Sequence, residues 1–401
     1  MDKWLEELPQ DVFDKILNLC SLRDTIRMSS VSKSFYSLSK QNIKRRRPQL
    51  PWLMMVSNPN SKLEQEEEAR CFFSLSDRTI HSIKIPEIRG KCCCGSFNNG
   101  KAAGWLMTTG SNLEIRLLHP WRGIQMQLPH YSTIYPVDYH PYFIRQWPQF
   151  TIRKAAMSDD AAVVAVINEP GEIAFCRTRE DEVWTRISCP FDQFYKFHDV
   201  IYHKGQFYVV GGDGKVGVLR INTAYPYLEI LSEMIGKIGA LRFHGKYNPL
   251  AYHRNYLVAD SASESLFIVR RVAHSHYNKN GFEVYELELQ ESTKDYKKNA
   301  VEVESLGDRV MFLGLSSSIL VMAGQFSGLK GNCIYFTDDC LKNTSFANES
   351  TDMGIFDMED ETIRPLFEDR AHPLFSPPIW ITPPGVESIS PSQIPSSRQG
   401  E

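Results

Sequence analysis

The sequence has no long apolar run. None of its hydrophobic stretches approaches the roughly 18 residues that a membrane-spanning helix needs. Residues 1–7 do not follow the basic, apolar and small-residue order of a secretory signal peptide. A net charge of −3 over 401 residues creates no basic field that would attract nucleic acid or an anionic membrane. We therefore expect a soluble protein of the nucleus or cytoplasm that binds neither nucleic acid nor membranes.

The cysteines lack the pattern of a metal site. There are nine of them, an odd number, and they are scattered apart from Cys92, Cys93 and Cys94. Three contiguous cysteines do not have the paired spacing of a structural zinc site, and no His-x-x-x-His complement lies nearby. We expect reduced thiols, as is usual inside cells, and no metal or other cofactor.

Catalytic motifs are missing as well. There is no Gly-x-Ser-x-Gly elbow and no His-Glu-x-x-His helix. One group of residues offers side chains for metal binding or acid–base chemistry, namely His198, Asp199, His203 and Asp213. The His198–Asp199 pair, however, falls at the start of a predicted strand, where Asp commonly hydrogen-bonds turn backbone. We favour that structural role, predict no catalytic residue and expect that the chain is not an enzyme.

What the first 45 residues do contain is apolar side chains at helical spacing. Leu8, Val12 and Ile16 recur every four residues and form one stripe on a helix. Pro9 stands in the first turn, where its missing N–H costs nothing. Two further stripes predict two more short helices: Leu22 with Ile26, and Val31 with Phe35 and Leu38. Three helices of this size are at best marginally stable alone, so their apolar face is meant for the rest of the chain or for another protein.

The order and spacing of this segment resemble an F-box. The resemblance rests on Leu8-Pro9, Val12, Ile16-Leu17, Leu22-Arg23-Asp24, Arg27, Val31-Ser32-Lys33 and Phe35. Ser32 stands where a cysteine is frequent and Phe35 where a tryptophan is frequent. The family implies docking on the Skp adaptor and, through it, on a cullin and a RING subunit of a ubiquitin ligase. The residues expected to contact the adaptor or support that surface are Leu8, Pro9, Val12, Ile16, Leu17, Leu22, Val31 and Phe35.

Beyond a junction, the remaining sequence predicts many short strands. The basic run Lys44–Arg47 lies within the junction, residues 41–51, and fits either a nuclear localisation patch or the solvated end of a helix. From Trp52 to about Pro384, β-rich runs alternate with Gly, Asn, Asp and Pro clusters, and long helical stripes are absent. Examples of these runs are residues 71–73, 105–107, 113–117, 162–166, 207–210, 266–269, 282–285 and 333–336. Many short strands favour an all-β domain, either a β-propeller or a pair of sandwiches.

The middle of the chain favours the propeller. Residues 198–219 read as three strands joined by two tight turns, and they resemble a kelch blade. The second turn, Gly211–Lys215, lacks the spacing of a phosphate-binding loop, so a hairpin accounts for it better. Residues 173–187 read as a preceding hairpin that ends near Trp184, and residues 307–314 repeat the pattern. At about 40–50 residues per blade, the body would hold about six to eight blades.

The body also resembles the C-terminal domain found beside F-boxes in a large plant family, a domain long described as of unknown function and regarded as a kelch-like propeller. The matching residues include Pro51-Trp52-Leu53, Ile85–Gly90, Gly104-Trp105-Leu106, Leu118–Trp121, Leu128-Pro129, Phe197–Val200, Tyr256-Leu257-Val258, Ser305–Asp308, Lys330–Asp339 and Trp380–Pro383. His119 stands where that family usually has asparagine. We expect an F-box at residues 1–45, a linker at 46–51, the propeller at 52–385 and a disordered tail at 386–401.

Together these features predict the substrate-recognition subunit of a Skp–cullin–F-box ubiquitin ligase. The helices would hold the adaptor and the propeller would hold an unidentified target protein, on a face that the sequence does not specify. Two alternatives stay open at this point. One is an adaptor-bound scaffold that delivers no ubiquitin, and the other is a propeller hydrolase or carbohydrate binder with a helical cap.

Overall fold

The computed structural model describes most of the β-rich body and a few positions of the N-terminal segment. The residues that it describes are 12, 15–16, 50–55, 69–76, 78–120, 123–134, 152–168, 171–187, 196–232, 242–243, 246–247, 251–260, 262–263, 265–274, 280–289, 300–337, 353–367 and 378–382. The predicted tail at 386–401 lies outside them, as does the predicted linker apart from Leu50 and Pro51. Within these residues, no helix is long and apolar enough to cross a membrane.

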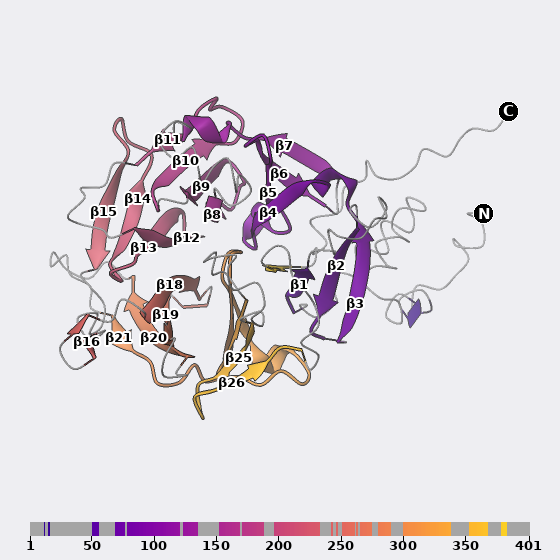
Figure 1. Cartoon of the computed structure of the whole chain (residues 1–401), viewed down its shortest axis with the longest axis vertical. Helices are drawn as coiled ribbons and strands as arrows, with labels where there is room; N and C mark the ends of the chain where they lie inside the picture. Colours follow the sequence, from indigo (N-terminus) through magenta and orange to yellow (C-terminus); the bar gives the residue numbers. More distant parts are fainter. Residues whose placement is uncertain are drawn as a thin grey trace.

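The strands form six blades around a common centre, in chain order, which is the arrangement of a β-propeller (Figure 1). Blade 1 consists of β27 (Ile379–Ile381), β1 (Trp52–Met55), β2 (Ala69–Ser74) and β3 (Thr79–Lys84). Blade 2 consists of β4 (Lys91–Ser96), β5 (Leu106–Gly110), β6 (Ile115–His119) and β7 (Ile124–Gln127). Blade 3 consists of β8 (Ile152–Met157), β9 (Val163–Asn168), β10 (Ile173–Arg177) and β11 (Thr185–Arg186).

The second half of the ring continues in the same way. Blade 4 consists of β12 (Phe197–His203), β13 (Gln206–Gly211), β14 (Val216–Arg220) and β15 (Tyr227–Ser232). Blade 5 consists of β18 (Ala251–Ala259), β19 (Ser265–His274), β20 (Asn280–Glu288) and β21 (Val301–Glu302). Blade 6 consists of β23 (Ile319–Met322), β22 (Arg309–Leu313), β24 (Cys333–Phe336), β25 (Gly354–Asp357) and β26 (Thr362–Pro365).

Short elements lie between the strands, some within a blade and some between blades. A two-stranded ribbon, β16 (Arg242–Phe243) with β17 (Lys246–Tyr247), lies in the chain between blades 4 and 5. The described 3-10 turns are η1 (Pro86–Ile88), η2 (Gly100–Ala102), η3 (Tyr131–Thr133) and η7 (Ala323–Gln325). Pro86 opens η1, where its fixed φ suits a helical first turn and its missing N–H is not needed.

The ring is closed by pairing the last described strand with the first. β27 runs antiparallel to β1, so that Leu53 faces Trp380 and Trp52 faces Ile381. Blade 1 therefore combines residues from both ends of the body. This shared blade leaves no open gap between the first and last blades, which is how propellers limit exposed strand edges.

Apolar side chains fill the spaces between neighbouring blades. One cluster joins Met107 and Ile115 of blade 2 to Val164 and Val166 of blade 3, and all four are fully buried. A second cluster joins blade 3 to blade 4 through residues such as Phe175 and Phe207. Because central strands are covered on both faces, β9 reads as a continuous run of apolar residues rather than an alternating one.

Blade 6 departs from the regular pattern. β22 pairs antiparallel with β23 but parallel with β24, whereas the other blades contain antiparallel pairs throughout. In sequence, the edge strand β23 follows its neighbour β22 instead of preceding it. The residues between these two strands, 314–318, are thereby carried towards the centre of the ring, where they make the contacts described below.

Most predictions about the fold are confirmed. An all-β propeller follows the N-terminal segment, and its six blades fall within the predicted range. The three-stranded unit predicted at residues 198–219 is β12, β13 and β14, and its second turn is a hairpin in which Gly211 and Lys215 pair through their backbones. Trp184 is buried just before β11 and donates its indole N–H to the Pro129 carbonyl. The likeness of the repeats to kelch blades stays a prediction.

Candidate functional site

Two of the residues predicted to contact an adaptor lie in the described part of the chain. Val12 and Ile16 have helical backbone, and their residues are 37% and 39% exposed. A spacing of four places them on the same face of a helix. The other predicted residues lie outside the described ones: Leu8, Pro9, Leu17, Leu22, Val31 and Phe35. An exposed apolar pair suits a surface that a partner covers, and contact with an adaptor stays a prediction.

The candidate target-binding domain has a buried ion pair at its centre. Lys154 on β8 and Asp199 on β12 are both fully buried, and the Nζ–Oδ1 distance is 3.1 Å. The other carboxylate oxygen of Asp199 accepts the backbone N–H of Leu257 on β18 at 2.9 Å. Burial raises the pKa of Asp199, and the Lys154 charge acts against that rise. Asp199 therefore connects the innermost strands of three consecutive blades.

The segment between β22 and β23 reaches across the centre of the ring. Lys154 Nζ donates to the Ser316 carbonyl at 2.9 Å, and the Trp380 N–H donates to Ser316 Oγ at 3.2 Å. The Ser317 N–H donates to the carbonyl of Ser96 at 3.1 Å. These bonds attach one loop of blade 6 to the innermost strands of blades 1, 2 and 3. Part of the space that the innermost strands surround is thus filled by the protein itself.

The four residues considered for catalysis, His198, Asp199, His203 and Asp213, each have separate structural contacts or positions. His198 accepts the backbone N–H of Asn255 on its Nδ1 atom at 3.2 Å, away from the Asp199 contacts. Asp213 caps its own turn, because it accepts the Lys215 N–H at 3.2 Å and pairs with Lys215 Nζ at 3.4 Å. His203 is buried at the end of β12. Among the described residues, no group of three or more His, Cys, Asp or Glu side chains is placed to hold a metal ion.

The three contiguous cysteines lie on β4 of blade 2. Cys93 and Cys94 are buried on β4, and Cys92 is half-buried. Burial raises the pKa of Cys93 to about 12 and that of Cys94 well above its usual value. The pairing of β4 with β5 skips Cys94, which marks a β-bulge at this position. Cys93, Cys94, Cys176 and Cys333 are buried free thiols.

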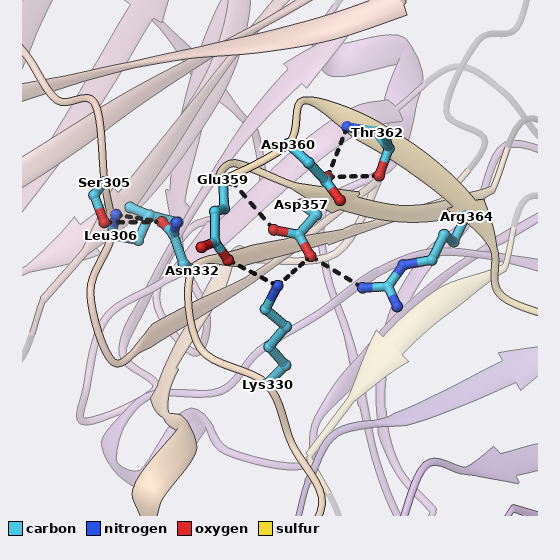
Figure 2. Close-up of polar contacts among 9 residues, drawn as sticks. All are labelled: Ser305, Leu306, Lys330, Asn332, Asp357, Glu359, Asp360, Thr362 and Arg364. Atoms are coloured by element: carbon cyan, nitrogen blue, oxygen red, sulfur yellow. Dashed lines mark hydrogen bonds and ion pairs between the residues drawn. The ribbon is translucent and has the colours of Figure 1, made fainter.

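An ionic cluster on blade 6 was not predicted from the sequence (Figure 2). Asp357 is 1% exposed and accepts Lys330 Nζ at 2.8 Å and Arg364 Nη2 at 3.1 Å. Lys330 also reaches Glu359 at 3.1 Å. The hydrogen bond from Lys330 lowers the pKa of Asp357, and Arg364 adds to the effect. The charged groups meet only once β24, β25 and β26 have paired, so local sequence patterns carry no signal for them.

Asn332 ties the same region to the segment between β21 and β22. It has a left-handed backbone, with φ at 59°, and its Oδ1 accepts the N–H of Leu306 at 2.7 Å. Asparagine is one of the few residues besides glycine that tolerate this conformation. In Figure 2 Asn332 lies beside the ionic cluster of Lys330 and Asp357. Both sets of contacts therefore act on the loop that precedes β24 and stabilise blade 6.

Comparison with known proteins identifies both parts of the chain. Residues 5–47 match the model of the F-box domain, and residues 72–357 match that of the KIB1-4 beta-propeller. The F-box protein At2g26160 of Arabidopsis thaliana is 22% identical over 84% of this chain and 96% of its own length. The F-box protein At4g35733 of the same plant is 25% identical over 60% of this chain and 63% of its own.

A solved structure with some likeness is the Cps50 (Swd1) beta-propeller domain of Myceliophteria thermophila. It is 8% identical and overlaps 62% of this chain and 90% of its own, with a TM-score of 0.32. A score this low adds nothing to the fold described above.

Proposed function

The chain belongs to the KIB1-4 beta-propeller family and carries an F-box, and we propose that it is the substrate-recognition subunit of a Skp–cullin–F-box ubiquitin ligase. The observation that carries this proposal is the order of the two matches: an F-box at residues 5–47 is followed by a propeller that spans residues 72–357. The exposed apolar pair Val12 and Ile16 lies inside the F-box match and supports it.

The mechanism of such a subunit is positional. The F-box holds the Skp adaptor, and through it a cullin and a RING subunit, while the propeller holds the target protein. Holding both raises the effective concentration of the target lysine near the ubiquitin-charged partner. No covalent step needs a residue of this chain. The contacts of Asp199 with Lys154 and of Asp213 with Lys215 fit that assignment, because both carboxylates serve the fold.

The loops of the propeller are the natural place for the target. Loops carried on a rigid scaffold tolerate variation and commonly hold binding residues. The bonds of Ser316 and Ser317 to three other blades fill part of the centre. A target segment would accordingly rest on the surface formed by the loops. The nuclear or cytoplasmic location expected from the sequence stays a prediction.

Co-purification tests the proposal. In tagged full-length protein, Val12→Asp together with Ile16→Asp places two charges on the exposed apolar pair. Because a few central apolar residues carry most of the energy of an interface, we expect a loss of the Skp adaptor of about tenfold or more. Val183→Asp is the matched control, since Val183 is 56% exposed but lies in blade 3. Retention of the adaptor at wild-type level by the double variant would contradict the assignment.

A second measurement separates a ligase subunit from a scaffold. If the chain delivers ubiquitin, the Val12→Asp/Ile16→Asp variant should lengthen the half-life of proteins that co-purify with the propeller. A scaffold predicts the same loss of adaptor with unchanged half-lives. Turnover of a glycoside or ester by the purified chain alone would instead favour the propeller hydrolase.

A further inference from the structure

Apolar side chains that are only partly covered lie where blades 1 and 6 meet, at neighbouring places in the ring (Figure 1). They are Leu75, Ile80, Met353, Leu366 and Phe367, and they are called the apolar rim below. Ile80 is 51% exposed, and the other four are half-buried. These four pack against the core cluster that fills the space between blades 1 and 6. The apolar rim is therefore the part of that core that still reaches the surface.

Blade 1 contributes the turn between β2 and β3. Leu75 follows directly after β2, and Ile80 is the second residue of β3. Ile80 is the cross-strand partner of Phe73, and such partners project from the same side of a sheet. The ring centroid of Phe73 lies 4.7 Å from that of Phe367. The exposed Ile80 is thus continuous with the side chains that blade 6 supplies.

Blade 6 contributes the ends of its two outer strands. Gly354 begins β25, Pro365 ends β26, and these two residues are paired. Met353 stands immediately before this pair in the sequence, and Leu366 and Phe367 stand immediately after it. One end of blade 6 and one turn of blade 1 therefore form a single apolar surface.

Leu50 fixes the N-terminal part of the chain to the same place. It is 4% exposed and belongs to the core cluster against which the apolar rim packs. Pro51, which links Leu50 to the start of β1 at Trp52, is buried as well. The chain is thus already attached to the body of the propeller at residue 50.

Very little chain separates this attachment from the F-box. The match to the F-box domain ends at residue 47, and three extended residues span at most about 11 Å. The end of the F-box segment, residues 5–47, must therefore lie close to Leu50. A segment of about forty residues buries too little surface to be more than marginally stable alone, so it gains stability by packing on an apolar surface within its reach.

We propose that the F-box segment packs on the apolar rim and thereby holds a bound adaptor at a fixed position relative to the propeller. The packing needs only the F-box match, whereas the fixed position of the adaptor rests on the proposed function. Val12 and Ile16 are 37% and 39% exposed, so the packing can leave this pair to the adaptor.

Hydrogen exchange of the full-length chain, measured by peptide mass spectrometry, tests the packing. We expect amides within residues 5–47 of the wild type to be protected. Leu75→Asp places a charge in the apolar rim and should speed the exchange of that segment by about tenfold or more, because a buried charge disfavours the packed state. Ser76→Asp is the matched control: Ser76 is the exposed neighbour of Leu75, and its variant should exchange like the wild type.

Blade 6 supplies an independent variant. Leu366→Asp should speed the exchange of residues 5–47 as Leu75→Asp does. Ile363→Asp is its control, since Ile363 is a 39% exposed apolar residue of β26 outside the apolar rim. Exchange of β13 in blade 4 shows whether the body stays folded. If β13 also exchanges faster, Leu75→Ser and Leu366→Ser take the place of the charged variants.

The outcomes separate the packing from the proposed function. An unprotected segment in the wild type, or wild-type exchange of the segment in both leucine variants, would overturn the packing. Protection that falls on dilution of the chain would also overturn it, in favour of a second copy seated on the apolar rim. In each of these cases, adaptor co-purification would still support the proposed function. Retention of the adaptor by Val12→Asp/Ile16→Asp, with the segment protected, would contradict the proposed function and support the packing.

Discussion

Lys154 and Asp199 form a fully buried ion pair between the innermost strands of blades 3 and 4, with 3.1 Å between Nζ and Oδ1. The pair is shielded from water, and backbone groups on two further blades complete its hydrogen bonds. Removing one partner of such a pair leaves a buried charge without compensation. Removing both charges avoids that penalty.

We therefore predict that Asp199→Asn lowers the free energy of unfolding by about 3–5 kcal/mol. The double variant Lys154→Met/Asp199→Asn should lose clearly less, because no ammonium is then stranded, and the asparagine oxygen can still accept the Leu257 N–H. Urea unfolding of the single and double variants measures the difference. A double variant as unstable as the sum of its two single variants would show that the residues do not act as a pair.

Trp380 should be the most sensitive residue of the closing strand β27. Its side chain is fully buried, donates to the Leu313 carbonyl at 3.1 Å and packs edge-on against Phe312. We predict a loss of about 3–5 kcal/mol for Trp380→Ala. Trp380→Phe should lose about 1 kcal/mol for the indole hydrogen bond, because the Thr337 N–H also donates to the Leu313 carbonyl and keeps it bonded. The smaller ring should add a further, modest loss. Thermal unfolding compares them with Tyr225→Ala, an 87% exposed control.

The ionic cluster around Asp357 should make the stability of blade 6 depend on pH in the acid range. The pKa of Asp357 is lower in the folded chain than in the unfolded one, so its contribution is complete above the unfolded pKa of about 3.9. It is lost as the pH falls through the lower folded pKa. Asp357→Asn should therefore cost about 2 kcal/mol at neutral pH and progressively less below about pH 4. Urea unfolding across this pH range, with exposed Glu180→Gln as control, measures it; a pH-independent cost would contradict the ionic role.

The buried thiols should resist alkylation. Thiolate is the reactive form, and burial raises the pKa of Cys93 to about 12. We predict that a short pulse of N-ethylmaleimide on the native chain labels half-buried Cys71 and Cys92 before Cys93, Cys94 and Cys176. Peptide mass spectrometry reads out each position. Equal labelling of Cys92 and Cys93 in the native chain would contradict the prediction and show that β4 opens readily. As a control, labelling in urea should proceed at the same rate at all of these cysteines.

Local sequence patterns were sufficient for the strands of the propeller. The run at residues 207–210 and its flanking turns predicted β12, β13 and β14, because apolar alternation and glycine turns are properties of neighbouring residues. Strand ends moved by a residue or two: the run predicted at 113–117 became β6 at Ile115–His119, since Leu113 lies in a left-handed turn with φ at 67°. The chain order of the blades follows from the same local signals.

Contacts between residues that are far apart in the sequence were beyond those patterns. Lys154 and Ser316 are separated by 162 residues, and nothing near either one predicts their bond. The same holds for Lys330 with Asp357, which meet because β24 and β25 pair. His198 was considered with Asp199, its neighbour in sequence, whereas its partners in space, Asn255 and His253, lie on β18. Among the described residues of the candidate site, only the apolar pair Val12 and Ile16 could be predicted from its spacing along the sequence.

The pairing of β27 with β1 has a consequence for the order of events during synthesis. The strand that completes blade 1, Ile379–Ile381, leaves the ribosome after every other described strand. Until then one edge of β1 has no partner, and the ring stays open. The F-box segment at residues 5–47, in contrast, emerges before all of these strands. An adaptor bound during translation would therefore meet its site long before the propeller is complete.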